Sequence, residues 1–333
     1  MQSRVGVPAS QWSNPSGIVA CMLLFRRCVQ RAFVIVLVAG TAAVVATAAA
    51  DSVGIVVLQT DFGLKDQAVA AMRGVIRNVD RRLVVDDLTH EIPAYNIWEA
   101  AYRLNAVIDY WPADAVFVSV VDPGVGTARK SVVARLNNGQ TFVTPDNGTL
   151  TLIADRIGLA AVREIDEHEH RLPGSADSYT FHGRDVYAYV GALLASGKLK
   201  FDDVGPPQSG IVRINYESAR RRGDTFIGGI PALDTQYGNI WTNIPAAGLE
   251  ALNVHIGDRV LLTISEGDAR HVRLTVVYVH TFADVPFGEP LLYVNSVGML
   301  AVALNQKDFA ATYAITSGPT WRVELTRAAA GSP

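Results

Sequence analysis

The chain has 333 residues, of which 49% are hydrophobic and 18% are charged, and its formal net charge is −3. This length and apolar content can fill one large core or two smaller ones, and they exclude a disordered or low-complexity protein. The slightly acidic balance disfavours a nucleic-acid partner.

Residues 1–50 predict a signal peptide. A cluster of arginines precedes a fourteen-residue apolar block, residues 32–45, and small residues follow up to Ala50. Because the block is shorter than the roughly twenty residues of a permanent transmembrane helix, we expect cleavage near Ala50 and export to the periplasm or the medium. An uncleaved anchor is the alternative, and Met22 is an alternative start.

Cleavage leaves an acidic protein without thiols. The leader holds four arginines and no acid, so the rest of the chain carries 25 basic and 32 acidic groups, a net charge of −7. Cys21 and Cys28 both lie in the leader. An oxidising compartment therefore suits the mature chain, for which we expect no stable membrane association.

Residues 51–204 predict an α/β domain with a central, mostly parallel sheet flanked by helices, because β-type runs alternate with segments of helical period. Residues 115–121 are almost entirely apolar, as is typical of a parallel strand covered on both faces. The other expected strands are residues 55–58, 83–85, 131–136 and 141–143, the last two joined by a hairpin, and the expected helices are residues 67–79, 97–110 and 185–196.

The second half of the chain predicts a smaller all-β domain. We expect a linker at residues 205–210, a β-barrel-like domain at residues 211–327, and a tail at residues 328–333. The β-type runs are residues 260–264, 272–279, 291–294 and 321–325.

The motif Thr-Asp-Phe-Gly at residues 60–63 follows the first expected strand, and Asp66 stands before the next helix. Ligands of open α/β sheets settle outside the carboxyl ends of the strands, where Asp61 can accept hydrogen bonds from a ribose diol. The alternative is that Asp61 or Asp66 caps the helix.

The motif Asp-Pro-Gly-Val-Gly-Thr at residues 122–127 follows the most apolar strand. Its tight turn can bring Asp122 and Arg129 together, and it lacks the Lys-Ser/Thr ending of a phosphate loop. A structural turn with a surface ion pair is the alternative.

The motif Phe-His-Gly-Arg-Asp at residues 181–185 precedes a helix and places His182 at the sheet edge, although a lone histidine is often a packed or surface residue. Residues 87–91, Asp-Leu-Thr-His-Glu, do not predict a metal site, because they define no ligand count.

Residues 233–243 combine a carboxylate, amides and aromatic rings, and residues 293–298 have a similar polar character after a strand. Such loops can bind the edge of a purine and pack on its face. Ordinary β-turns are the alternative for each.

In this order, the motifs at residues 60–63, 122–129 and 181–185 resemble those of the S-adenosyl-L-methionine hydroxide adenosyltransferase family, the hydrolase relatives of fluorinase and chlorinase. The resemblance spans residues 54–327. It implies hydrolysis of S-adenosyl-L-methionine to adenosine and L-methionine by in-line attack of an activated water on C5′, with no metal or organic cofactor. It also implies a homotrimer in which the ligand lies between the first domain of one subunit and the second domain of its neighbour.

The resemblance assigns roles to individual residues. It implies that Asp122, Arg129 and His182 form the water-activating triad. Val297 stands where the halogenating relatives have an arginine that clamps the substrate carboxylate. The substrate-binding residues that it implies are Asp61, Asp66, Tyr95, Asp234, Asn239, Trp241, Phe282 and Ser296.

Two other functions are compatible with the sequence. A halide-dependent, chlorinase-like adenosyl transferase would need a dehydrated halide pocket, which the charged Asp122 argues against. A non-catalytic periplasmic nucleoside-binding protein is suggested by the export signal.

Overall fold

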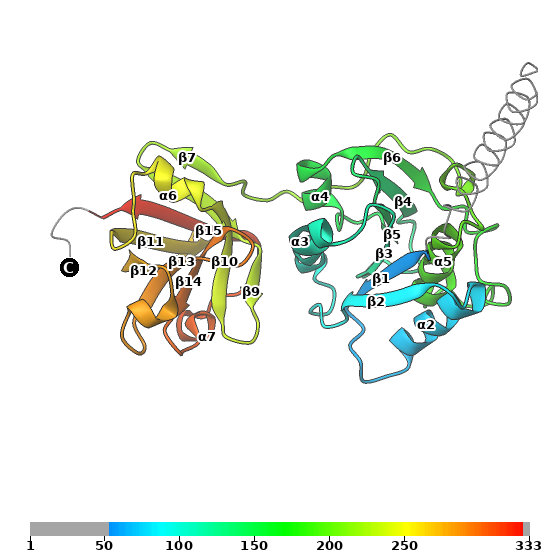
Figure 1. Ribbon diagram of the computed structural model, residues 1–333, viewed down its shortest axis with the longest axis horizontal. Coiled ribbons are helices and arrows are strands. Elements are labelled where there is room, and N and C mark those ends of the chain that lie inside the picture. The colour runs from blue at the N-terminus through cyan, green and yellow to red at the C-terminus, as the bar shows by residue number, and fades with distance from the viewer. Residues whose placement is uncertain (1–52, 329–333) are drawn as a thin grey trace, which may run out of the picture. The chain divides into compact units, whose positions relative to one another are not determined.

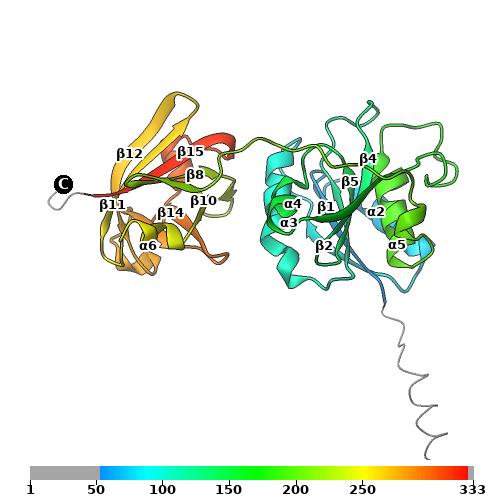
Figure 2. The ribbon, with the colours of Figure 1, turned by 90° about the horizontal axis from the view of Figure 1, so that it is seen from above.

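The computed structural model describes residues 53–328, which form two domains joined by a single crossing of the chain (Figures 1 and 2). The predicted fold class is confirmed: a mostly parallel sheet with helices precedes a mostly antiparallel, all-β domain. The predicted leader with its cleavage site and the last five residues of the tail lie outside the described residues.

The first domain is a six-stranded sheet with the strand order β2-β1-β3-β5-β4-β6. Strand β1 pairs in parallel with β2 and β3, β3 pairs in parallel with β5, and β4 runs antiparallel to both β5 and β6. The elements are β1 (Ile55–Thr60), α2 (Ala68–Val79), β2 (Val84–Thr89), α3 (Ile97–Val107), a 3-10 turn (Ile108–Tyr110), β3 (Val116–Val120), β4 (Ser131–Leu136), β5 (Thr141–Pro145), α4 (Thr151–Arg156), β6 (Leu159–Glu164), a π-helix (Gly183–Ala188), α5 (Tyr189–Ala195) and a 3-10 turn (Phe201–Asp203).

Helices cover both faces of this sheet. Val56 and Leu58 of β1 pack with α2, the π-helix and α5, whereas Val57 packs with α3 and α4 on the opposite face (Figure 2). All five residues of β3 are buried, in agreement with a central parallel strand. The carboxyl ends of β1 and β3 therefore lie side by side at one edge.

The second domain is a single nine-stranded sheet with the order β7-β8-β15-β11-β12-β13-β14-β10-β9, in which only the pair β12 and β13 is parallel among the described strands. Its elements are β7 (Arg220–Arg222), β8 (Thr225–Ile230), β9 (Ala232–Asp234), β10 (Asn239–Pro245), α6 (Ala247–Ala251), β11 (Arg259–Glu266), β12 (Ala269–Tyr278), a 3-10 turn (Phe282–Asp284), β13 (Pro290–Val294), β14 (Met299–Leu304), α7 (Phe309–Tyr313) and β15 (Gly318–Arg327).

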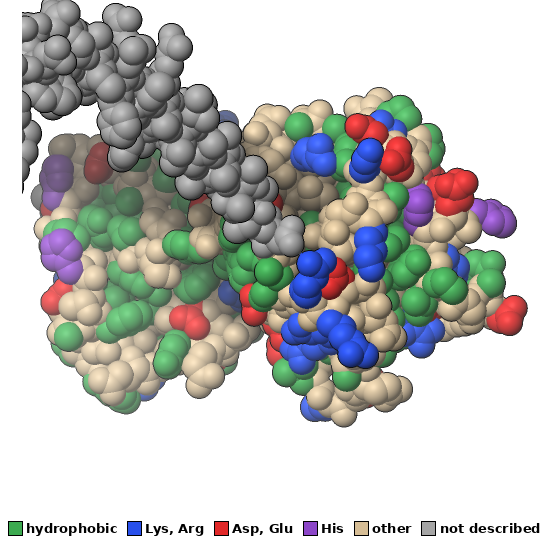
Figure 3. Space-filling view, turned by 45° about the vertical axis from the view of Figure 1, so that its right-hand side comes forward, with side chains coloured by type: hydrophobic (Ala, Val, Ile, Leu, Met, Phe, Trp, Pro, Cys, Tyr) green, Lys and Arg blue, Asp and Glu red, His purple; other side chains and the backbone are tan. Residues whose placement is uncertain are grey.

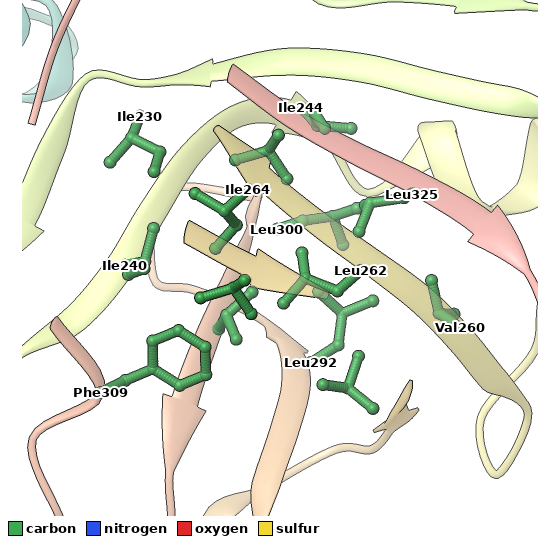
Figure 4. Packing of buried hydrophobic residues seen from close by; sticks show 14 of the residues in the cluster. Ile230, Ile240, Ile244, Val260, Leu262, Ile264, Leu292, Leu300, Phe309 and Leu325 are labelled. Carbon is green, nitrogen blue, oxygen red and sulfur yellow. The ribbon is translucent and has the colours of Figure 1, made fainter. Parts of the chain in front are cut away.

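This sheet folds back on itself. The backbone N–H of Gly229 in β8 donates to Oδ1 of Asn243 in β10 at 2.8 Å, although five strands lie between β8 and β10 in the sheet order. The enclosed core is made of aliphatic side chains, with Phe309 of α7 closing one side (Figure 4). Burial of these side chains on folding stabilises the domain.

Several elements were not predicted. Strands β7–β10 and β14, strand β6 and helix α4 have no matching prediction, because short strands with polar or small residues lack a clear period. The predicted helix at 185–196 begins instead as a π-helix, Gly183–Ala188, directly after His182. Such irregular helical turns are frequent at functional sites.

The predicted linker is bound to the first domain. The N–H of Glu164 donates to the carbonyl of Pro206, and Gln208 N–H donates to the carbonyl of Val162, each at 2.9 Å. Further on, Ile214 N–H donates to Oγ1 of Thr151 at 3.0 Å. The hydroxyl of Tyr216 also donates to Asp155 at 3.0 Å, so the chain stays in contact with the first domain up to residue 216.

The surface carries both signs of charge. Lys and Arg side chains gather in places on the face shown in Figure 3, but acidic and apolar side chains lie among them. Within residues 53–328, no helix combines the length and the hydropathy that a membrane crossing requires.

The packing of α5 on β3 can be tested at Gly191. A Cβ atom at this position would lie 2.5 Å from Cγ2 of Val118, whereas a Cβ at the exposed Gly74 of α2 would have no neighbour within 4 Å. We expect Gly191→Ala to lower the free energy of unfolding by about 1–3 kcal/mol through overpacking. Gly74→Ala should raise it by roughly 1 kcal/mol through helix propensity. Urea unfolding followed by circular dichroism measures both, and equal stabilisation by the two substitutions would contradict this packing.

Candidate active site

Asp122, Arg129 and His182 come together from two loops at one edge of the first-domain sheet. Asp122 follows the end of β3, and Arg129 lies two residues before β4. Because β4 is antiparallel to β5, its first residue Ser131 pairs with Pro145 at the end of β5, so β4 starts at the edge where β3 and β5 end. His182 immediately precedes the π-helix.

The loop between Asp122 and Arg129 is a glycine-dependent turn. The N–H of Val125 donates to the carbonyl of Asp122 at 3.2 Å, and Gly126 has a φ of +76°. A Cβ on Gly124 would lie 3.0 Å from Cγ of Arg129. The glycines therefore leave room for the arginine to turn back toward Asp122.

Asp122 and Arg129 form a buried, two-pronged ion pair. Nε of Arg129 donates to Oδ1 of Asp122 at 2.8 Å and Nη2 donates to Oδ2 at 2.5 Å, while the side chains are only 10% and 6% exposed. Burial by itself lowers the pKa of Arg129, but the hydrogen bonds and the charge of Asp122 outweigh it, so the pKa is raised. The guanidinium is a permanent cation.

The imidazole of His182 is held by the same guanidinium. Nη2 of Arg129 lies 2.8 Å from Nδ1 of His182. Since arginine has only donors, Nδ1 accepts and the proton of the neutral ring is on Nε2. Nε2 is buried and makes no hydrogen bond to any described residue. Burial lowers the pKa of His182, and the charges of Arg129 and Arg171 lower it further, against the opposing carboxylates of Glu167 and Asp122.

A cavity of about 390 Å³ opens beside this trio. Asp61, Tyr95, Asp122 and His182 line it together with apolar side chains such as Phe181. Oδ2 of Asp61 accepts the N–H of Tyr95 at 2.8 Å, and Tyr95 has a left-handed φ of 69° that is costly for a bulky residue. The structure thus brings two predicted ligand residues, 34 positions apart, to one wall.

Asp66 lies outside the lining of this cavity. It is exposed, and its Oδ1 accepts the N–H of Ala68 at 2.9 Å, which closes a turn at the start of α2. The carboxylate of Asp66 thus stabilises the start of α2, and its role as a ligand residue stays a prediction.

The remaining predicted ligand residues line a second cavity, of about 1080 Å³, in the second domain. They are Asp234, Asn239, Trp241, Phe282 and Ser296. Nδ2 of Asn239 donates to Oδ2 of Asp234 at 3.3 Å, and the ring of Phe282 lies 4.9 Å from that of Tyr293. Aromatic faces beside amide and carboxylate groups suit a planar heteroaromatic ligand.

Side chains that no motif indicated support the trio. Ser131 Oγ accepts Arg129 Nη1 at 2.8 Å, donates to Glu167 Oε1 at 2.6 Å, and lies 3.0 Å from the hydroxyl of the buried Tyr187. Burial raises the pKa of Tyr187 well above its usual value, so its hydroxyl stays protonated. No local pattern singles out Glu167, which lies in the loop after β6.

His90 also supports the site. Its Nδ1 lies 2.8 Å from Oγ1 of Thr60, and its carbonyl accepts the N–H of Gly63 at 2.8 Å. It thereby holds both ends of the 60–63 motif around Asp61. No cluster of three or more potential metal-binding His, Cys, Asp or Glu side chains occurs within residues 53–328.

This chain is similar in sequence to one protein family and to several relatives. The SAM hydroxide adenosyltransferase N-terminal domain matches residues 56–205, and the C-terminal domain of the same family matches residues 228–322. The (R)-S-adenosyl-L-methionine hydrolase of Salinispora tropica is 37% identical over 267 residues, which cover 79% of this chain and 95% of the relative. The fluorinase of Actinopolyspora mzabensis is 27% identical over 295 residues, covering 81% and 96%.

A solved structure has the same fold. The crystal structure of an uncharacterized conserved protein from Thermotoga maritima superposes with a TM-score of 0.73 at 34% sequence identity. The superposition covers 82% of this chain and 100% of the chain from Thermotoga maritima.

The state of His182 is directly measurable. Because its pKa is lowered and Arg129 donates to Nδ1, we expect a neutral ring with its proton on Nε2 at pH 7. Nitrogen-15 imidazole spectra, assigned with a His182→Asn variant, report both the charge and the tautomer. A signal from an Nδ1-protonated or doubly protonated ring at pH 7 would contradict the Arg129 contact.

Proposed function

This chain belongs to the SAM hydroxide adenosyltransferase family, and we propose that it is a hydrolase that converts S-adenosyl-L-methionine to adenosine and L-methionine. The observation that carries the proposal is the guanidinium of Arg129, fixed between Asp122 and His182, which both line the cavity. Relatives named as (R)-S-adenosyl-L-methionine hydrolases, 35–37% identical over most of their length, support it.

The chemistry needs an oriented nucleophile more than an acid. The sulfonium of the substrate makes methionine a neutral thioether leaving group, so breaking the C5′–S bond requires no proton. A water oxygen forms the new bond to C5′, the electron pair of the C5′–S bond stays on sulfur, and one proton of the water is lost. In-line attack inverts C5′.

Arg129, His182 and Asp122 have different roles in activating the water. The positive charge of Arg129 favours the deprotonated form of a nearby water. Nε2–H of His182 donates to the water oxygen, which leaves Asp122, the carboxylate of the three and a lining residue of the cavity, to take the proton. His182 does not take the proton in this scheme, because its Nδ1 already accepts a hydrogen bond from Arg129.

We further propose that Asp61 and Tyr95 hold the ribose side and that the second-domain cavity holds the adenine. Since these groups lie in two cavities on two domains, a homotrimer with sites between neighbouring subunits remains our proposal. Light scattering of the purified protein tests the trimer.

Export with removal of residues 1–50 is likewise a proposal. Mass spectrometry of the protein recovered from its host would then find Asp51 at the N-terminus.

The decisive assay is product analysis. The purified chain, incubated with S-adenosyl-L-methionine with and without chloride, is expected to release adenosine in both cases. A chloride-dependent chlorinated nucleoside would favour the halide-using alternative. Intact substrate that nevertheless binds would favour a nucleoside-binding protein.

Substitutions in the ion pair test the mechanism. We expect Arg129→Ala and Asp122→Asn to lower turnover by about a hundredfold or more, with a smaller effect on KM, because the pair acts on the developing charge and not on the bound nucleoside. Arg81→Ala, in the exposed turn after α2, is the matched control and should keep the original rate. Either ion-pair variant at full rate would refute the assigned roles.

A further inference from the structure

Glu167 touches the network around Arg129 through Ser131. Its side chain is 30% exposed, and its Oε1 accepts the hydroxyl of Ser131 at 2.6 Å. The same oxygen lies 3.9 Å from Nδ1 of His182, and Oε2 lies 3.7 Å from Nη1 of Arg171. Glu167 lines neither of the two cavities described above.

The carboxylate of Glu167 determines the direction of the Ser131 hydrogen bonds. An ionised carboxylate only accepts, so the single hydroxyl hydrogen of Ser131 points to Glu167. The lone pairs of Ser131 then face Nη1 of Arg129, a donor, and the hydroxyl of Tyr187. Without the carboxylate, the Ser131 hydrogen is free to turn, and the acceptor for Nη1 is no longer fixed.

Glu167 also balances the charge around His182. The groups that face the imidazole are the cations Arg129 and Arg171, the anions Asp122 and Glu167, and the phenols of Tyr179 and Tyr187. Removing the charge of Glu167 leaves two cations against one anion. Protonation of His182 then becomes less favourable.

We propose that Glu167 is a positioning residue of this site, which acts through Ser131 to hold the guanidinium of Arg129 against Nδ1 of His182. It touches neither the attacking water nor the substrate. The consequence for turnover rests on the proposed hydrolase function, whereas the effect on His182 does not depend on turnover.

The test is Glu167→Gln, which keeps the size of the side chain and removes its charge. We expect kcat to fall about ten- to a hundredfold through misplacement of Arg129, with KM changed less than about twofold. Glu167→Asp, which keeps the charge, should recover part of the loss. Glu169→Gln, an exposed neighbour in the same loop, is the matched control and should be indistinguishable from the unaltered protein.

A second readout separates positioning from a general loss of structure. In Glu167→Gln, the NMR titration midpoint of His182 should move to lower pH, because a carboxylate that favours the imidazolium has been removed, and in Glu169→Gln it should stay. Since the neutral ring is the working form, the acidic limb of the pH–rate profile should move to lower pH in the same direction.

The outcomes distinguish the two proposals. Wild-type turnover and an unmoved His182 titration in Glu167→Gln would overturn the role of Glu167 and leave the hydrolase assignment intact. An unaltered protein that forms no adenosine, but whose His182 midpoint moves in Glu167→Gln, would overturn the hydrolase assignment and support the positioning role.

Discussion

The buried ion pair between Asp122 and Arg129 is the constraint on which the rest of the first-domain site depends. Each charge would cost several kcal/mol to bury alone, and breaking such a pair by removing one partner typically costs about 3–5 kcal/mol. The two-pronged geometry uses Nε and Nη2 of the arginine and leaves Nη1 for Ser131. The direction of the guanidinium is therefore determined before any ligand arrives.

This direction decides what the neighbouring histidine can do. A histidine at the edge of an α/β sheet is readily interpreted as a base, but a guanidinium at Nδ1 of His182 makes the ring a donor through Nε2. A donor and a cation beside one carboxylate are suited to stabilise a hydroxide-like oxygen. In the proposed reaction, the site acts on water through this electrostatic arrangement and not through the basicity of the imidazole.

A second layer of contacts holds the ligand-facing loops of the first domain. His90 binds both Thr60 and Gly63, and Asp61 is tied to the backbone of Tyr95, whose left-handed conformation stores strain. These contacts are made at the ends of β1 and β2, where a parallel sheet leaves its backbone groups unpaired. The loops that follow these strands are thus held in place by hydrogen bonds between their own residues.

The sequence by itself determined most of the strands and helices of the first domain, the all-β character of the second, and the three motifs whose side chains meet beside the cavity. Local patterns suffice there, because periodicity and turn residues act over a few positions. Only the tertiary structure decided that Glu167 and Ser131 hold Arg129, that Asp66 closes a helix turn, and which nitrogen of His182 carries the proton. The contact of Glu167 with Ser131 and that of Arg129 with His182 join residues 36 and 53 positions apart, and the direction of each donor is not encoded in any spacing along the chain.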